Sequence, residues 1–243
     1  MKLFVTDYDG TLYINDTNFD INKSKLRELH NLGIIIVIST GRSYESIKKQ
    51  IIEHNIYYDY IHCADGSIIY DKNDNLINFC EMEHEVVNEI LSLSKKAKIN
   101  EIQIIYPKEY KKQYNKNDKI AGINLVIKKE LLKKEFVNEF LNLKNKYSNY
   151  NFLYYSHVDY AYLCVKKEHV NKAYAIKYMQ ELLNINKSDI YVIGDSYNDI
   201  EMIQEYNGSS IIGNSEINDL SRKSYHYVYE YIDEIKEDLS IKI

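Results

Sequence analysis

The run Ile34-Ile35-Ile36-Val37-Ile38 constrains the fold more than any other segment, because all five of its residues are β-branched. A strand that is apolar at every position is buried on both faces, which is typical of a parallel sheet covered by helices. Further apolar runs begin at Phe4 and Ile190. Between the runs we expect helices over residues 22–32, 44–54 and 172–183, and two further strands over residues 60–63 and 210–213. Strands that alternate with helices predict an α/β fold with a parallel sheet and right-handed crossovers.

The middle of the chain has a different order of elements. We expect helices over residues 83–98 and 129–147, and strands over residues 101–106, 121–127, 152–155 and 160–165. This αββαββ order predicts an antiparallel sheet with two helices, inserted as a cap between two halves of the parallel core. The predicted core therefore consists of residues 1–80 and 167–243, and the predicted cap of residues 81–166.

Composition narrows the class of protein. A length of 243 residues with 45% hydrophobic content is sufficient for a packed core. The net charge of −5 argues against a protein that grips nucleic acid, because such proteins need clustered Lys and Arg. No apolar run approaches the roughly 20 residues of a membrane span, and no signal segment is evident. We expect a cytoplasmic protein that binds small ligands, with Cys63, Cys80 and Cys164 as buried thiols, since their spacing fits neither zinc nor a disulfide framework.

The first apolar run ends in Asp7-Tyr8-Asp9-Gly10-Thr11. Residues two apart on a strand point the same way, so Asp7 and Asp9 are expected to face one ligand before Gly10 allows a sharp turn. Adjacent carboxylates repel each other, so either a divalent cation neutralises one or its neighbour keeps one protonated. Both conditions suit a reaction in which one aspartate attacks phosphorus and the second transfers a proton. The alternative is an ordinary Asp-Gly turn.

Polar residues also follow the other expected strands of the core. These segments are Ser39-Thr40-Gly41-Arg42, Ala64-Asp65-Gly66-Ser67 and Gly194-Asp195-Ser196-Tyr197-Asn198-Asp199. Ligands of open parallel sheets bind beyond the carboxyl ends of the strands. We therefore expect these segments to meet at one edge of the sheet.

Four motifs in this order resemble those of the haloacid dehalogenase superfamily of phosphohydrolases. They are Asp7-x-Asp9-Gly10-Thr11, Thr40-Gly41-Arg42, Lys172 and Gly194-Asp195-x-x-Asn198-Asp199. The inserted cap resembles the Cof-type, or IIB, branch, and the resemblance covers nearly the full length. It implies a Rossmann-like core with a C2-type αββαββ cap that determines substrate specificity. The implied activity is Mg²⁺-dependent hydrolysis of a small phosphorylated metabolite, either a sugar phosphate or a phosphorylated cofactor, through an aspartyl-phosphate.

The resemblance also implies roles for individual residues. Asp7 is the nucleophile, and Asp9 is the acid that protonates the leaving oxygen and later activates water. Thr40, through its hydroxyl and backbone N–H, and Lys172 act on the phosphate and complete the catalytic set. The expected phosphate-binding residues are Thr40, Gly41, Arg42, Lys172 and Asn198. The expected metal-binding residues are Asp7, Asp9 through its backbone carbonyl, Asp195 and, through a metal-bound water, Asp199.

Two positions depart from the family pattern. Asp65 stands where family members commonly have Asn, and Ala173 follows Lys172 where Gly is common. Asp65 is either an additional negative charge near the site or only a turn residue. Lys166 and Lys167 compete with Lys172 for the lysine role, and Arg42 either contacts substrate or forms a structural ion pair. As a whole, the protein could instead be a phosphosugar mutase or a catalytically silent phospholigand-binding or regulatory protein.

Overall fold

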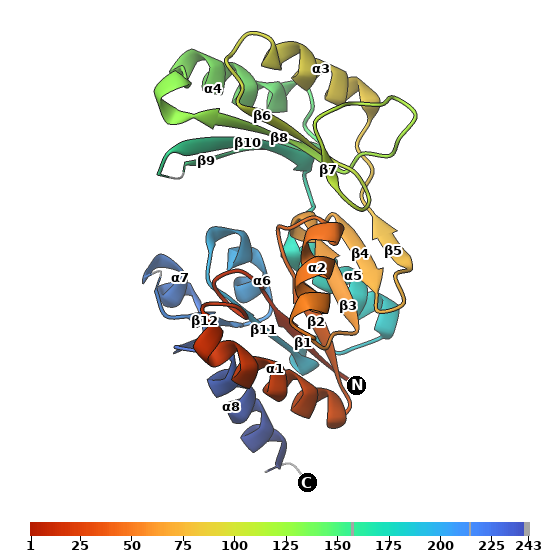
Figure 1. Ribbon diagram of the computed structural model, residues 1–243, viewed down its shortest axis with the longest axis vertical. Coiled ribbons are helices and arrows are strands. Elements are labelled where there is room, and N and C mark those ends of the chain that lie inside the picture. The colour runs from red at the N-terminus through yellow and green to blue at the C-terminus, as the bar shows by residue number, and fades with distance from the viewer. Residues whose placement is uncertain (157, 214, 241–243) are drawn as a thin grey trace. The chain divides into compact units, whose positions relative to one another are not determined.

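The computed structural model describes residues 1–156, 158–213 and 215–240 (Figure 1). The chain divides into two compact units. The first comprises Met1–Arg42, Ser46–Ile77 and Asn171–Ile243, and the second comprises Ser43–Glu45 and Asn78–Val170. The first unit is thus assembled from both ends of the chain. Among the helices that the structure describes, none combines the length and apolarity that crossing a membrane requires.

The first unit is built on a sheet that has eight strands in the described residues, in the order β13-β12-β11-β1-β2-β3-β4-β5. Its parallel strands are β1 (Lys2–Thr6), β2 (Ile34–Ser39), β3 (Tyr60–Cys63), β11 (Ile190–Gly194), β12 (Ser209–Ile211) and β13 (Ser224–Tyr225). β4 (Ile68–Asp71) runs antiparallel to β3, and β5 (Leu76–Phe79) lies at the edge next to β4. The predicted α/β class with a parallel central sheet is confirmed.

Helices cover both faces of this sheet, as the continuous apolar strands predict. They are α1 (Asp16–Asn31), α2 (Tyr44–Glu53), α5 (Lys172–Leu183), α6 (Ile200–Glu205), α7 (Ser215–Leu220) and α8 (Val228–Ser240). On one face, Val5 of β1 belongs to the same buried cluster as Ile176 of α5 and Met202 of α6. On the other face, the Phe4 ring lies 6.1 Å from the ring of Tyr231 in α8, and α8 packs along α1.

Three helices of the core differ from the prediction, and one of them, α7, was not expected. α1 begins at Asp16, before the expected start at residue 22, because Phe19 is buried and packs edge-on against the ring of Tyr13. α8 was not predicted, although Val228, Tyr231, Ile232 and Ile235 are buried at helical spacing. Acidic residues lie between these apolar positions, so the helical spacing is less evident in the sequence.

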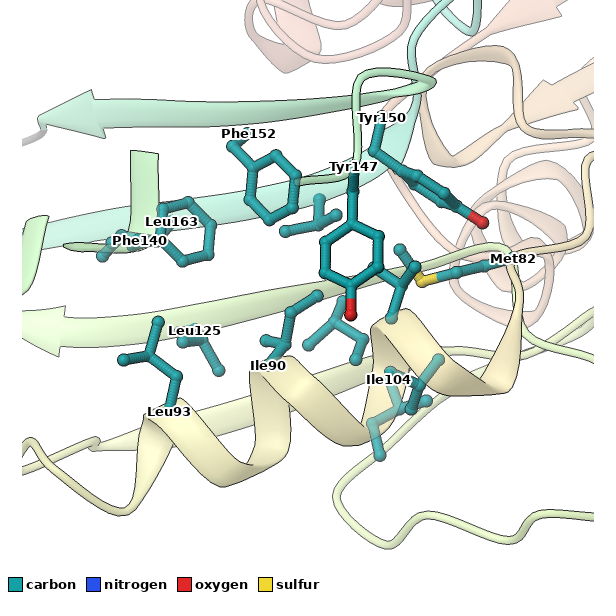
Figure 2. Packing of buried hydrophobic residues seen from close by; sticks show 14 of the residues in the cluster. Met82, Ile90, Leu93, Ile104, Leu125, Phe140, Tyr147, Tyr150, Phe152 and Leu163 are labelled. Atoms are coloured by element: carbon teal, nitrogen blue, oxygen red, sulfur yellow. The ribbon is translucent and has the colours of Figure 1, made fainter. Parts of the chain in front are cut away.

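The second unit contains an antiparallel sheet in the order β7-β6-β8-β10-β9, as predicted for the cap. Its elements are α3 (His84–Ser94), β6 (Glu101–Ile105), β7 (Tyr110–Lys111), β8 (Gly122–Lys128), α4 (Lys134–Asn142), β9 (Tyr150–Ser156) and β10 (Tyr160–Lys167). Figure 2 shows Ile90 and Leu93 of α3 facing the apolar side chains of this sheet. The rings of Phe140 and Phe152 meet edge to face at 5.4 Å. The unit therefore has a hydrophobic core of its own.

The expected helix over residues 129–147 is wrong in its bounds. α4 covers only Lys134–Asn142, between two 3₁₀ turns at Lys129–Leu131 and Leu143–Asn145. The backbone is extended at Leu132 and Lys133, which ends the first turn before α4 begins. The short strand β7, which pairs with β6, was also missed.

Two of the three cysteines, Cys63 and Cys80, are buried as expected. Cys164 is only half-buried, which corrects the third expectation. Its neighbours Leu163 and Val165 on β10 belong to the core of the second unit. Because side chains alternate along a strand, Cys164 lies on the opposite face of the sheet, away from that core.

Candidate active site

The predicted polar segments of the first unit meet at the carboxyl edge of its sheet. Thr6, the last residue of β1, is in register with Ile38 of β2 and Ile193 of β11, so the loops after these strands start at the same level. Asp7 follows β1 directly, and its N–H donates to the Ile193 carbonyl at 3.0 Å. The site is therefore formed by chain segments that are far apart in the sequence.

Lys172 lies at the centre of the site. It is the first residue of α5, whose N-terminus is capped by the Asn171 side chain. The fully buried Lys172 ammonium donates to Oδ1 of Asp7 and to Oδ1 of Asp199, each at 2.6 Å. Burial lowers the pKa of Lys172, but the charges of Asp199 and Asp7 outweigh it and the net shift is upward. Lys172 is therefore a cation held between two acids.

Of the two competing lysines, Lys167 belongs to the second unit. Its ammonium contacts Oε1 of Glu83 at 2.5 Å. Lys166, the other candidate, is a half-buried residue of β10 in the same unit. Within the first unit, the geometry favours Lys172 for the lysine role.

Asp199 fixes the loop that follows β11. Its Oδ1 accepts from Lys172, while its Oδ2 accepts the backbone N–H groups of Asp195 at 3.1 Å and Ser196 at 3.0 Å. The side chain is fully buried. Asp199 therefore links the charge at the centre of the site to the position of Asp195.

Three carboxylates form a group that suits a divalent cation. Oxygen atoms of Asp7, Asp195 and Asp199 lie within 4.8 Å of one another. Burial raises the pKa of Asp7, an effect that Lys172 opposes and Asp199 reinforces. Burial also raises the pKa of Asp195, although the Thr11 hydroxyl, which donates to Asp195 Oδ1 at 2.6 Å, acts against it. A single Lys172 leaves this group with excess negative charge, and carboxylate oxygens are the ligands that Mg²⁺ prefers.

The carboxylate of Asp9 is not one of this group of three acids. β1 ends at Thr6, so the alternation of a strand does not extend to these residues. The Asp9 carboxylate instead accepts two hydrogen bonds from Arg42, from Nη2 to Oδ1 at 2.6 Å and from Nε to Oδ2 at 2.7 Å. Arg42 thus forms the ion pair that was one of its two expected roles.

The turn after Asp9 requires glycine. Gly10 has a φ of +82°, which L side chains rarely adopt, and its N–H donates to the Tyr13 carbonyl at 3.0 Å. A Cβ at this position would lie 2.5 Å from Oδ2 of Asp195. The backbone of this turn therefore packs directly against the carboxylate of Asp195, one of the three acids that could bind a cation.

Thr40 is buried at the end of β2, and only part of its expected role fits the geometry. Its N–H donates to the His62 carbonyl at 2.8 Å, so this group is engaged within the sheet and is not the phosphate donor that was expected. The Thr40 hydroxyl oxygen accepts the N–H of Arg42 at 3.1 Å. The hydroxyl retains its own proton as a possible donor to phosphate.

Asp65 is both a turn residue and an additional negative charge near the site, the two alternatives that the sequence left open. It is a turn residue in the left-handed region, with φ 52° and ψ 39°, and its N–H donates to the Thr40 carbonyl at 3.1 Å. Its Oδ1 accepts the Asn198 amide at 2.9 Å, and its charge adds to the upward shift of the Lys172 pKa. Gly41 lies beside this pair, since a Cβ there would be 3.1 Å from Asp65 Oδ1. Asp65 therefore links the loops after β3 and β11.

Three residues near the site had no assigned role in the sequence. Thr11 holds Asp195, and Ser196 Oγ donates to Asn198 Oδ1 at 2.5 Å. His62 on β3 is fully buried, and neither ring nitrogen has a hydrogen-bond partner among the described residues. Burial, with a contribution from Lys172, lowers the pKa of His62 to about 3. Thr11 belongs to a motif that the sequence revealed, whereas nothing in the local sequence distinguishes His62 from a core residue.

Comparisons with known proteins find phosphatases that are similar to this chain. A family model described as sucrose-6F-phosphate phosphohydrolase matches residues 1–229. The 5-amino-6-(5-phospho-D-ribitylamino)uracil phosphatase YcsE of Bacillus subtilis is 26% identical over 94% of this chain and 89% of its own. The structure of the phosphatase BT1666 from Bacteroides thetaiotaomicron has a TM-score of 0.77 at 15% identity, over 96% of this chain and 94% of that one. The structure of BT4131, described as a subclass IIB sugar phosphatase of the haloacid dehalogenase superfamily, has a TM-score of 0.71 at 15% identity, over 97% and 99%.

Proposed function

Because this chain belongs to the sucrose-6F-phosphate phosphohydrolase family, within the haloacid dehalogenase superfamily of phosphatases, we propose that it hydrolyses a small phosphorylated metabolite with the help of Mg²⁺. The observation that carries the proposal is the buried Lys172 ammonium, 2.6 Å from both Asp7 and Asp199, beside the group of three carboxylates. Such an arrangement places a positive charge beside the attacking carboxylate, in a site that must also accept an anionic phosphate. Intact acids and lysine argue against a silent binding protein.

In the first step of the proposed reaction, an oxygen of Asp7 attacks phosphorus. The bond between phosphorus and the leaving oxygen breaks, and Asp9 gives its proton to that oxygen. The products are the alcohol and an aspartyl-phosphate on Asp7. In the second step, water attacks phosphorus and gives a proton to Asp9. The bond between phosphorus and the Asp7 oxygen breaks, so that inorganic phosphate leaves and the Asp7 carboxylate is restored.

The remaining groups bind and orient the phosphate in this proposal. The Lys172 ammonium and the Thr40 hydroxyl act on the phosphate oxygens, with Gly41, Arg42 and Asn198 around them. Asp7, Asp195 and the Asp9 carbonyl would hold Mg²⁺, with Asp199 beside it. A cation bound there would offset the negative charge of the carboxylates and of the phosphate.

We assign substrate selection to the cap, residues 81–166. This proposal is supported by the separate core and antiparallel sheet of the second unit, which let it vary independently of the catalytic residues. By their names, YcsE acts on a phosphorylated ribitylaminouracil and BT4131 on sugar phosphates. Both support a small metabolite as substrate, either a sugar phosphate or a phosphorylated cofactor.

The test is phosphate release from a panel of sugar phosphates, flavin mononucleotide and pyridoxal phosphate, with Mg²⁺ present. Asp7→Asn keeps the shape of the side chain but removes the nucleophile, so turnover should fall by several orders of magnitude. Asp16→Asn, which removes an exposed acid that contacts Tyr13, is the matched control and should keep its turnover. Near-native activity of Asp7→Asn would refute the mechanism, and an isomerised product without phosphate release would identify a mutase.

A further inference from the structure

Arg42 connects two residues to which the proposed reaction gives different tasks. Its guanidinium donates to both oxygens of Asp9, at 2.6 and 2.7 Å, and its backbone N–H donates to the Thr40 hydroxyl oxygen at 3.1 Å. The guanidinium carbon also lies 5.2 Å from the centre of the Tyr8 ring. The arginine is thus held in a defined position between the acid and the phosphate-binding residue.

In this arrangement Asp9 is not ready to transfer a proton, as the proposed reaction requires. Proton transfer requires one Asp9 oxygen in contact with the leaving oxygen or with water. Both oxygens are instead occupied by donors of the Arg42 fork. A protonated Asp9, which the first step requires, has lost the negative charge and one of the acceptor sites that bind the Arg42 fork, so this pair must loosen during the reaction.

The substrate itself carries the group that can open the pair. The planar guanidinium fork fits two phosphate oxygens as well as it fits a carboxylate, and phosphate brings a larger negative charge. The pair is also accessible, since the side chains of Arg42 and Asp9 are 31% and 51% exposed. An incoming phosphate can therefore compete with Asp9 for the same donors.

From this geometry we infer that Arg42 is a positioning residue that exchanges partners: it holds the Asp9 carboxylate in the free enzyme and moves to the substrate phosphate, which frees Asp9 to take up a proton from solvent and deliver it to the leaving oxygen. The inference rests on the proposed function, because it concerns the same site. It gives Arg42 both of its expected roles, the ion pair and the phosphate contact, one after the other. Release of Asp9 is thereby tied to the presence of a phosphate.

The test is a double-mutant cycle on the binding of inorganic phosphate, measured by calorimetry with Mg²⁺ present and without turnover. The four proteins are the wild type, Asp9→Asn, Arg42→Gln and the double variant. Phosphate must displace Asp9 from Arg42 in the wild type, but meets a weaker competitor in Asp9→Asn. We expect Asp9→Asn to bind phosphate roughly two- to fivefold more tightly than the wild type, in line with the strength of accessible ion pairs.

The Arg42→Gln background separates competition from general electrostatics. Removal of the Asp9 charge raises anion affinity in any background, but competition for Arg42 exists only where Arg42 is present. The gain from Asp9→Asn should therefore shrink in the Arg42→Gln protein, whereas an equal gain in both backgrounds would overturn the exchange. Arg42→Lys, which keeps the charge but not the fork, should lie between the two, and Asp16→Asn controls for the loss of a charge elsewhere.

The outcomes also separate this inference from the proposed function. If Asp7→Asn loses turnover but the double-mutant cycle shows no coupling between Asp9 and Arg42, the partner exchange is overturned and the proposed function is not. A wild-type protein that binds no phosphate would count against the phosphate site, and with it against both. Thermal unfolding of each variant verifies that the compared proteins are folded.

Discussion

At the scale of single residues, Lys172 determines the charge balance of the buried acids. It is enclosed by Asp7 and Asp199, which lie on different loops and are themselves buried. Breaking a buried pair is costly, because the remaining charge stays without compensation in a medium of low polarity. Substitution of Lys172 by an uncharged residue would leave two buried carboxylates, Asp7 and Asp199, without this positive charge.

We therefore expect Lys172→Met to lower the free energy of unfolding by about 3–5 kcal/mol, measured by urea denaturation. The matched control is Lys167→Met, because the Glu83 partner of Lys167 is more than half exposed. That change should cost at most about 1 kcal/mol. Equal losses in the two variants would contradict the structural role of Lys172.

His62 should make the stability of the protein depend on pH. Its pKa is about 3 in the folded protein, because of burial and of Lys172, against an ordinary value of 6.5. Between these values the unfolded chain binds the proton and the folded protein does not, so stability falls as the pH falls. The loss is about 1.4 kcal/mol for each pH unit below 6.5.

His62→Leu removes this group, and its unfolding free energy should decline less on acidification. Between pH 7.5 and 5, we expect the wild type to lose about 2 kcal/mol more than the variant. Chemical denaturation at a series of pH values measures both slopes. Parallel slopes would show that His62 is protonated in the folded protein or is not buried in solution.

At the scale of elements, the site depends on where strands stop. β1 ends at Thr6, β2 at Ser39 and β11 at Gly194, and their pairing places these ends at one edge. The turn that follows β1 then approaches the loop that follows β11. Gly10 is the point of contact, because its missing side chain leaves room for the Asp195 carboxylate.

Two glycines with similar backbones test this contact. Gly10 and Gly33 have φ values of +82° and +78°, but a Cβ at Gly33 would meet no atom within 4 Å. Alanine at either position should cost about 1–2 kcal/mol of backbone strain. Only Gly10→Ala should also displace Asp195 and raise the Mg²⁺ concentration needed for half-maximal activity. A similar metal requirement in both variants would show that the contact does not position the ligand.

At the scale of the whole molecule, each unit has its own buried core, and the carboxylate group lies in the first unit alone. Its three acids come from two loops, β1 to α1 and β11 to α6. A cation bound by these loops binds the folded state and not the unfolded chain. Metal binding is therefore linked to folding.

Accordingly, Mg²⁺ should raise the melting temperature and chelation should abolish activity reversibly. The stabilisation should reach about 2.7 kcal/mol at a Mg²⁺ concentration of 100 times Kd. Asp195→Asn should shift both effects to higher Mg²⁺ concentrations, whereas Asp16→Asn should shift neither. A melting temperature that is independent of Mg²⁺ in the wild type would argue against a metal site.

The sequence by itself determined the class of fold, the antiparallel sheet of the cap segment and the edge at which the polar segments meet. These features follow from local patterns, since apolar periodicity sets the element type and glycines mark the turns. The bounds of β3 and α5 were predicted to the residue. The motif resemblance further pointed to Asp7, Asp195, Asp199 and Lys172, which the structure brings together.

Only the tertiary structure decided which of these side chains pair. The Asp9 carboxylate contacts Arg42, the Thr40 N–H donates to the His62 carbonyl, and Asp65 holds Asn198. Each partner lies on another strand or loop, and the direction of a side chain in a loop has no periodicity that a sequence could reveal. Pairing across the sheet edge is fixed by strand order and register, which arise only when the whole sheet has formed.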